Sequence, residues 1–177
     1  MTGRARVIDW VVDRLRKLVR RADTPTPSHL RRTPEDLFAF GGSREAGFPR
    51  PPRARQDFHL ASDTGTIPGH APPTSAADEI PGASTFRSVD EGLPFFQSGT
   101  TQVFGLPAGT DLPPGLAYHA DGSDIPGGTA PAGHRTIYNT DDMSYSEFSS
   151  LYANPDVGWA HHGTVRRGQF SPTPPPT

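Results

Sequence analysis

The chain of 177 residues is long enough for one domain with appendages, and its formal net charge is −2. Proline (21) and glycine (19) are abundant, yet aromatic residues are spread through the middle of the chain, which favours a turn-rich folded centre over general disorder. The absence of cysteine excludes disulfides and thiolate metal sites, and the spacing of the seven histidines indicates no metal site.

The N-terminal segment, residues 4–22 (RARVIDWVVDRLRKLVRRA), has apolar residues at helical spacing among Arg and Lys and predicts an amphipathic helix. Residues 1–22 hold seven basic and two acidic residues, which leaves ten basic and 17 acidic residues in the remainder. Three interpretations stay open: the helix packs on its own acidic domain, it docks on a membrane surface or a partner, or it is a loading signal read by a secretion machine.

Residues 23–34 contain three prolines and predict a flexible linker. No apolar run approaches the roughly 18 residues that cross a bilayer, so no stable membrane span is expected. The N-terminus also lacks the apolar centre and cleavage pattern of a secretory signal peptide.

The body is expected at residues 35–163, as short strands separated by turns. The predicted strands are 36–40, 57–61, 101–106, 115–120 and 134–139, each bounded by Gly, Pro or Asp. Residues 143–153 predict a helix, because Ser144 and Glu147 form a capping-box pattern. The glycine-rich residues 124–133 indicate a hairpin loop, and residues 164–177 a disordered proline-rich tail.

Several common function classes are disfavoured. The chain has no phosphate-binding P-loop, no dinucleotide-binding glycine pattern and no nucleophile-elbow pattern. A nucleic-acid module is disfavoured as well, because the body is net negative once the first 22 residues are set aside.

The order of several motifs in residues 36–163 resembles the ADP-ribosyltransferase-like toxin family typified by an exported type VI secretion effector. The motifs are PGASTF (81–86), GLPAGTDLPPGLAYHADG (105–122) and GHRTIYNTDDMSYSEFSSLY (133–152), after an arginine-bearing segment that ends in RARQDFHL. The resemblance implies an α+β fold with a split antiparallel or mixed sheet, few helices and a cleft for a nicotinamide dinucleotide, preceded here by the isolated helix.

Such a cleft breaks the bond between nicotinamide and ribose through an oxocarbenium-like state, which requires cations for the diphosphate, a hydroxyl for the ribose and a carboxylate for the positive charge. The resemblance implies Ser84, with Thr85 beside it, as the hydroxyl, and His134 as a further catalytic residue. The plain alternatives are backbone capping by the hydroxyls and a structural strand histidine.

The cofactor contacts follow from the same resemblance. Arg53 and Arg55 are candidates for the diphosphate, with a solvated loop as the alternative, and Tyr138 is added as a further contact. Family members often carry an arginine in the first strand, where this chain has Ala39, so the cation is expected from the loop arginines. NAD is the expected substrate, and no metal is expected.

Two functions remain open. In the first, the protein is a toxin effector that a secretion or contractile injection system loads through residues 4–22 and delivers, without a signal peptide, from the producer's cytoplasm into a target cytoplasm. There it would act as an NAD-dependent ADP-ribosyltransferase or NAD glycohydrolase, with a cellular target and an immunity protein as partners. In the second, it is a non-catalytic module with a degenerate site that docks on a partner assembly. One concave pocket that joins Ser84, an arginine and an aromatic face favours the first, and a filled cleft favours the second.

Overall fold

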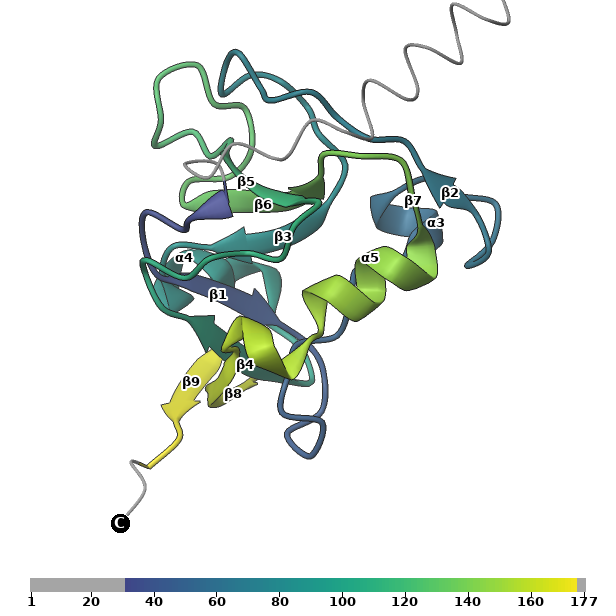
Figure 1. Ribbon diagram of the computed structural model, residues 1–177. Helices are drawn as coiled ribbons and strands as arrows, with labels where there is room; N and C mark the ends of the chain where they lie inside the picture. Colours follow the sequence, from purple (N-terminus) through teal and green to yellow (C-terminus); the bar gives the residue numbers. More distant parts are fainter. Residues whose placement is uncertain (1–30, 175–177) are drawn as a thin grey trace, which may run out of the picture.

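The computed structural model describes residues 31–174, which form an α+β fold dominated by one antiparallel sheet (Figure 1). The sheet has seven strands in the order β5-β6-β3-β1-β4-β8-β9, and β2 and β7 pair separately. Its strands are β1 (Leu37–Phe40), β3 (Ala83–Phe86), β4 (Thr100–Leu106), β5 (Leu116–Ala120), β6 (His134–Asn139), β8 (Ala160–Arg166) and β9 (Gln169–Pro172). The remaining elements are α3 (Ala54–Asp57), β2 (Thr66–Ile67), α4 (Val89–Gly92), η1 (Leu93–Phe95), β7 (Met143–Ser144), α5 (Tyr145–Tyr152) and η2 (Pro155–Val157).

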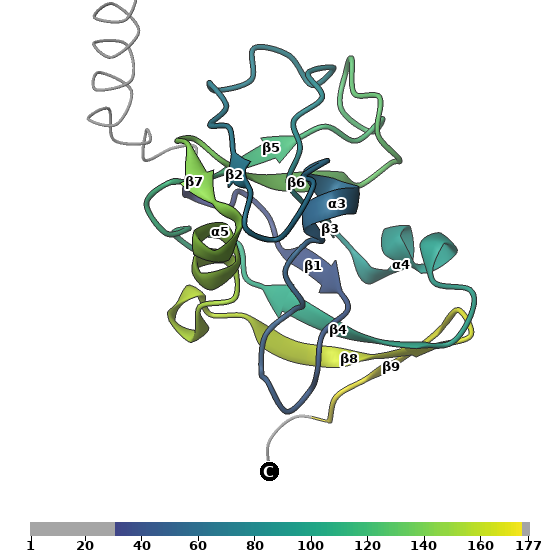
Figure 2. The same cartoon turned by 90° about the vertical axis from the view of Figure 1, so that its right-hand side faces the viewer.

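Alternation along the strands builds a core on each side of the sheet. Helix α5 covers one face, where Phe148 packs with Leu37 and Ile137 in the larger apolar cluster. On the other face, α4 and η1 cover a smaller cluster that includes Val103 and Val165. Figure 2 shows α5 and α4 on opposite sides of the sheet.

The sheet opens between β1 and β3. These two strands pair at one position, Phe38 with Phe86, whereas β1 pairs with β4 at four positions and β3 with β6 at four. Because the strands are antiparallel, Phe40 and Ser84 stand beyond that pair at ends that diverge. A gap therefore separates the two halves of the sheet on this side, and the candidate site lies there.

Most of the predicted strands are confirmed, with β1, β4, β5 and β6 close to the expected ranges. The strand predicted at 57–61 is wrong: Ala54–Asp57 is a short helix, and His59 has a positive φ of 54° that ends regular structure. The PGASTF segment, which was not among the predicted strands, holds β3. Gly82 enables this strand to begin there, because a Cβ at this position would collide with the Ile137 carbonyl oxygen of β6.

The predicted helix at 143–153 is confirmed as α5, preceded by the two-residue strand β7. Ser144 caps it, since its hydroxyl accepts from the Glu147 backbone N–H at 3.1 Å. Within the described residues the exposed Glu147 carboxylate makes no bond back to Ser144, so half of the capping box forms.

The C-terminal prediction is also corrected, because residues 164–172 belong to β8 and β9 rather than to a disordered tail. Arg167 and Gly168 both have positive φ, 50° and 75°, the geometry of a tight two-residue hairpin. Val165 pairs with Phe170 across that hairpin and both join the smaller core cluster. The pairing of β9 therefore depends on this hairpin, which the composition of the tail does not indicate.

The folded domain begins before residue 35. Thr33 is 1% exposed, and its backbone exchanges hydrogen bonds with Gly109 and Thr110 in the turn-rich 106–122 segment. The last residues of the predicted 23–34 linker are thus anchored to the body. The predicted helix at 4–22 and the rest of the linker lie outside the described residues, and in residues 31–174 no helix is long and apolar enough to cross a membrane.

Candidate functional site

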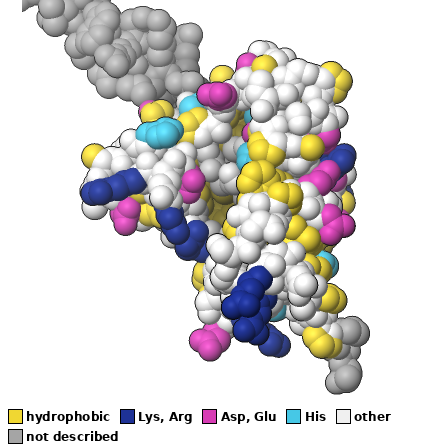
Figure 3. Space-filling model, turned by 180° about the vertical axis from the view of Figure 1, so that it is seen from behind, with side chains coloured by type: hydrophobic (Ala, Val, Ile, Leu, Met, Phe, Trp, Pro, Cys, Tyr) yellow, Lys and Arg dark blue, Asp and Glu magenta, His cyan; other side chains and the backbone are white. Residues whose placement is uncertain are grey.

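Two cavities of about 210 and 530 Å³ adjoin where the sheet opens, and both are lined by Asp57 and Ser84. We call them together the Ser84 groove. Figure 3 shows the molecule hollowed on its back, with hydrophobic side chains inside the hollow and charged ones around it. Together the two cavities have the size of common small-molecule sites, which run from about 300 to 1,000 Å³.

The smaller cavity combines a cation, a hydroxyl and aromatic rings. Arg50 comes from the loop after β1, Ser84 from β3, and Phe86 and Phe96 supply apolar surface. Ala39 of β1 lines the same cavity. Within residues 31–174 the exposed Arg50 guanidinium forms no ion pair, so it can bind an anion in the cavity.

Ser84 and Thr85 are separated by the alternation of β3. Ser84 is exposed, lines both cavities, and has no hydrogen-bond partner for its hydroxyl within the described residues. Thr85 is fully buried, and its hydroxyl donates to the Arg135 carbonyl at 3.0 Å. This corrects the placement of Thr85 in the site: it stabilises the sheet, and Ser84 alone of the pair faces the groove.

The larger cavity is lined by acidic side chains. Asp57, Asp78, Glu79 and Asp121 all contribute to its wall. Backbone N–H groups of Thr74 and Ser75 donate to the Asp78 carboxylate and hold its pKa below the usual range. The Asp121 carboxylate is hydrogen-bonded to the His134 ring. A wall of this charge repels a diphosphate and attracts positive charge, so an anion is favoured in the smaller cavity, at Arg50.

His134 is present in the larger cavity and is held by a carboxylate. Its Nδ1 lies 2.8 Å from Asp121 Oδ1, and Thr136 Oγ1 donates to Asp121 Oδ2 at 2.7 Å. Burial alone would raise the pKa of Asp121, but its hydrogen bond with His134 and the attraction of that imidazole outweigh burial and lower the pKa. The His134 ring also stands edge-to-face on Phe86, with the ring centres 5.5 Å apart.

The other sequence-predicted site residues lie elsewhere. Arg53 and Arg55 line a separate cavity with Tyr145, away from Ser84. Tyr138 is fully buried, and within the described residues its hydroxyl has no partner. Desolvation raises the pKa of Tyr138 to about 12, so the ring is a neutral core residue that does not line the groove.

Sequence reasoning missed Asp57 and Arg50 as groove residues. Both lie in the arginine-bearing segment between β1 and β2, but only the path of that loop over the opened sheet places them beside Ser84. Their signal was the composition of the segment, which carries Arg44, Arg50, Arg53 and Arg55 without indicating which one faces inward.

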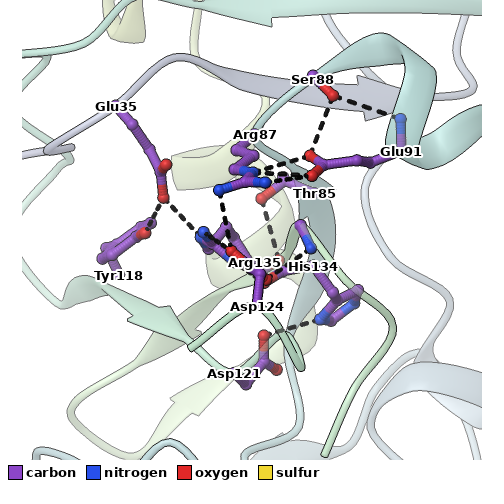
Figure 4. Close-up of polar contacts among 11 residues, drawn as sticks. Glu35, Thr85, Arg87, Ser88, Glu91, Tyr118, Asp121, Asp124, His134 and Arg135 are labelled. Atoms are coloured by element: carbon purple, nitrogen blue, oxygen red, sulfur yellow. Dashed lines mark hydrogen bonds and ion pairs between the residues drawn. The ribbon is translucent and has the colours of Figure 1, made fainter. Parts of the chain in front are cut away.

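A second polar cluster surrounds the buried Arg135 (Figure 4). Because Arg135 pairs with Thr85 and Thr136 pairs with Ser84, this cluster lies on the face of β3 and β6 opposite to Ser84. Arg135 is 1% exposed and pairs with Glu35 and Asp124, and Glu35 also accepts from the Tyr118 hydroxyl. These contacts satisfy the charges that they bury. We call these residues the Arg135 cluster, and its closed contacts indicate a structural role.

The described residues, 31–174, contain no group of three or more His, Cys, Asp or Glu side chains placed to hold a metal ion. Comparison with known proteins finds no matching family model, curated protein or solved structure.

Proposed function

We propose that this chain is a toxin effector whose body is an ADP-ribosyltransferase-like domain that binds NAD in the Ser84 groove and cleaves its nicotinamide–ribose bond. One observation carries the proposal: a single cavity joins the Ser84 hydroxyl and the Arg50 guanidinium, both exposed and without a polar partner among residues 31–174, with the aromatic rings of Phe86 and Phe96. The cavity lies where two halves of a sheet part, as a split-sheet nucleotide cleft requires.

Each part of NAD has a suitable partner in the groove. The diphosphate is a dianion, which Arg50 would bind with its planar fork of donors. Phe86 and Phe96 contribute apolar lining against which an aromatic base would pack, and Ser84 offers a hydroxyl for the ribose. Asp57 lines both cavities, so its carboxylate would face the positive charge that develops as nicotinamide leaves.

Delivery is the second half of the proposal. The basic segment 4–22 would load the protein into a secretion or contractile injection system, and the domain would then act in a target cytoplasm. Deleting residues 1–22 should abolish packaging while the body stays folded. Packaging of the truncated protein, or its unfolding, would assign the segment to the domain instead.

The binding step is tested by titrating NAD into the full chain by calorimetry. Arg50→Ala should weaken binding by about ten- to a hundredfold, because a charged contact to diphosphate is lost. Arg53→Ala and Arg55→Ala are matched controls, since they remove the same charge outside the groove. Absence of NAD binding by the wild type would support the alternative, a non-catalytic docking module, and equal losses for all three variants would place the nucleotide elsewhere.

A further inference from the structure

The Asp121–His134 pair is oriented in a way that a structural role alone does not require. Asp121 uses one carboxylate oxygen for His134 Nδ1 and the other for the Thr136 hydroxyl. This fixes the imidazole so that Nδ1 faces the carboxylate and Nε2 is left for another partner. Within residues 31–174, Nε2 of His134 makes no hydrogen bond, whereas His161 uses both of its ring nitrogens.

The register of β3 and β6 places this imidazole near Ser84. Ser84 pairs with Thr136 and Phe86 pairs with His134, so the four side chains share one face of the sheet. His134 is the diagonal neighbour of Ser84, and diagonal neighbours are within reach of long side chains. Both residues line the larger cavity, which continues through Ser84 into the cavity with Arg50.

We propose that His134 is the general base of the groove and that Asp121 is its positioning residue. The inference rests on the proposed NAD binding and adds the acceptor: an oxygen nucleophile, water in the isolated protein. Asp57 and Ser84 join the two cavities, so a ribose beside them has Arg50 on one side and the imidazole on the other. The nucleotide occupies the basic end, and the acceptor enters from the acidic end.

The step balances with water and NAD alone. A water O–H bond breaks as its proton moves to His134 Nε2, and the oxygen forms a bond to the ribose C1 carbon. The bond from that carbon to the nicotinamide nitrogen breaks, and its electron pair stays on the nitrogen. Neutral nicotinamide and ADP-ribose leave, and His134 then releases its proton to solvent.

The pH dependence of the step follows from the groups around the imidazole. Asp121 holds it directly, His119 lies near Asp121, and Asp57, His59, Asp78 and Glu79 complete the charged lining of the cavity. A general base must be in its neutral form, because a protonated His134 cannot accept a proton. The rate of nicotinamide release should therefore fall as the pH drops and follow a single protonation.

The test compares NAD affinity with nicotinamide release for full-length variants. His134→Asn should leave the NAD dissociation constant unchanged and lower kcat by about 10²- to 10⁴-fold, the usual contribution of a general base. Asp121→Asn should lower kcat and shift the pH profile. Imidazole in solution should partly restore His134→Gly. His162→Asn is the matched control, because His162 is exposed and lies outside the groove.

The outcomes separate the two proposals. If His134→Asn binds NAD and keeps the wild-type kcat, the role of His134 is overturned and the proposed NAD binding stands. The same conclusion follows if the wild type binds NAD but releases no nicotinamide. A wild-type kcat that is flat between about pH 5 and 8 also overturns it, even where His134 variants do not fold. No NAD binding by the wild type overturns both proposals.

Discussion

Two polar clusters lie on opposite faces of β3 and β6, and they differ in how many of their polar groups form hydrogen bonds or ion pairs within the cluster. In the Arg135 cluster, the guanidinium is buried between two carboxylates, and Thr85 is bonded to the backbone. In the Ser84 groove, the Ser84 hydroxyl and the Arg50 guanidinium are open to solvent. Groups that bond to one another stabilise a fold, and groups held ready without partners are those that can bind a ligand.

The largest effect should come from Arg135→Met. The change leaves Glu35 and Asp124 without their buried partner and should lower the free energy of unfolding by about 3–5 kcal/mol. Arg87→Met is the control, because Arg87 also pairs with Asp124 but its side chain is 44% exposed, and its loss should be much smaller. Chemical denaturation measures both, and equal losses would break the distinction between the clusters.

The second-largest effect should come from acid, which weakens the ion pair between Arg135 and Asp124. Hydrogen bonds from Arg135 outweigh desolvation and hold the pKa of Asp124 well below its ordinary value of 3.8. A depressed pKa in the folded state gives stability above the unfolded value that is lost as the pH falls. The free energy of unfolding should decline below about pH 4, and the decline should be shallower in Asp124→Asn. An equal slope in the two proteins would contradict this assignment.

A smaller contrast separates the neighbouring hydroxyls. Thr85→Val removes a buried hydrogen bond and should cost about 1 kcal/mol of stability, with NAD binding retained. Ser84→Ala removes an exposed hydroxyl that has no partner within the described part of the chain, and it should stay within about 0.5 kcal/mol of wild type while NAD turnover falls. Unfolding curves measure the stability of both variants, and turnover assays measure their activity. A stability loss in Ser84→Ala with a turnover loss in Thr85→Val would exchange the roles of the two residues.

The smallest effect is expected for Tyr138→Phe. The buried Tyr138 hydroxyl has no partner among the described residues, so its removal should leave stability unchanged or slightly raised at neutral pH. Desolvation raises the pKa of Tyr138 to about 12 in the folded state, from 10.0 in the unfolded chain. The unfolded chain therefore loses the phenol proton first, and the free energy of unfolding falls as the pH rises from 10 towards 12. Tyr138→Phe should lose less stability over that alkaline range, and a large loss at neutral pH would reveal a contact made by the hydroxyl.

The sequence predicted the local features of this fold better than its pairings. Short runs bounded by Gly, Pro or Asp located β1, β4, β5 and β6, and Ser144 marked the start of α5. Strand β3 escaped because four residues between Gly82 and Arg87 carry too little alternation to distinguish a strand from a turn. Strand β9 escaped because its pairing depends on the Arg167–Gly168 hairpin rather than on its own composition.

Of the residues that line the Ser84 groove, the sequence analysis had singled out Ser84 and His134, but it could not tell which face of the sheet their neighbours Thr85 and Arg135 occupy. Alternation separates Ser84 from Thr85 and His134 from Arg135, and the register that decides the faces is a property of the pairing. The choice of Arg50 over Arg53 and Arg55 depends on how a loop crosses the opened sheet, which no local pattern encodes.

The occupancy of the Ser84 groove can be measured most directly with a single thiol, because the chain contains no cysteine. Ser84→Cys places one alkylatable group in the groove, and Ser98→Cys places one on an exposed loop outside it. Millimolar NAD should slow alkylation of Ser84→Cys and leave Ser98→Cys unaffected. Equal alkylation rates of Ser84→Cys with and without NAD would contradict nucleotide binding in the groove.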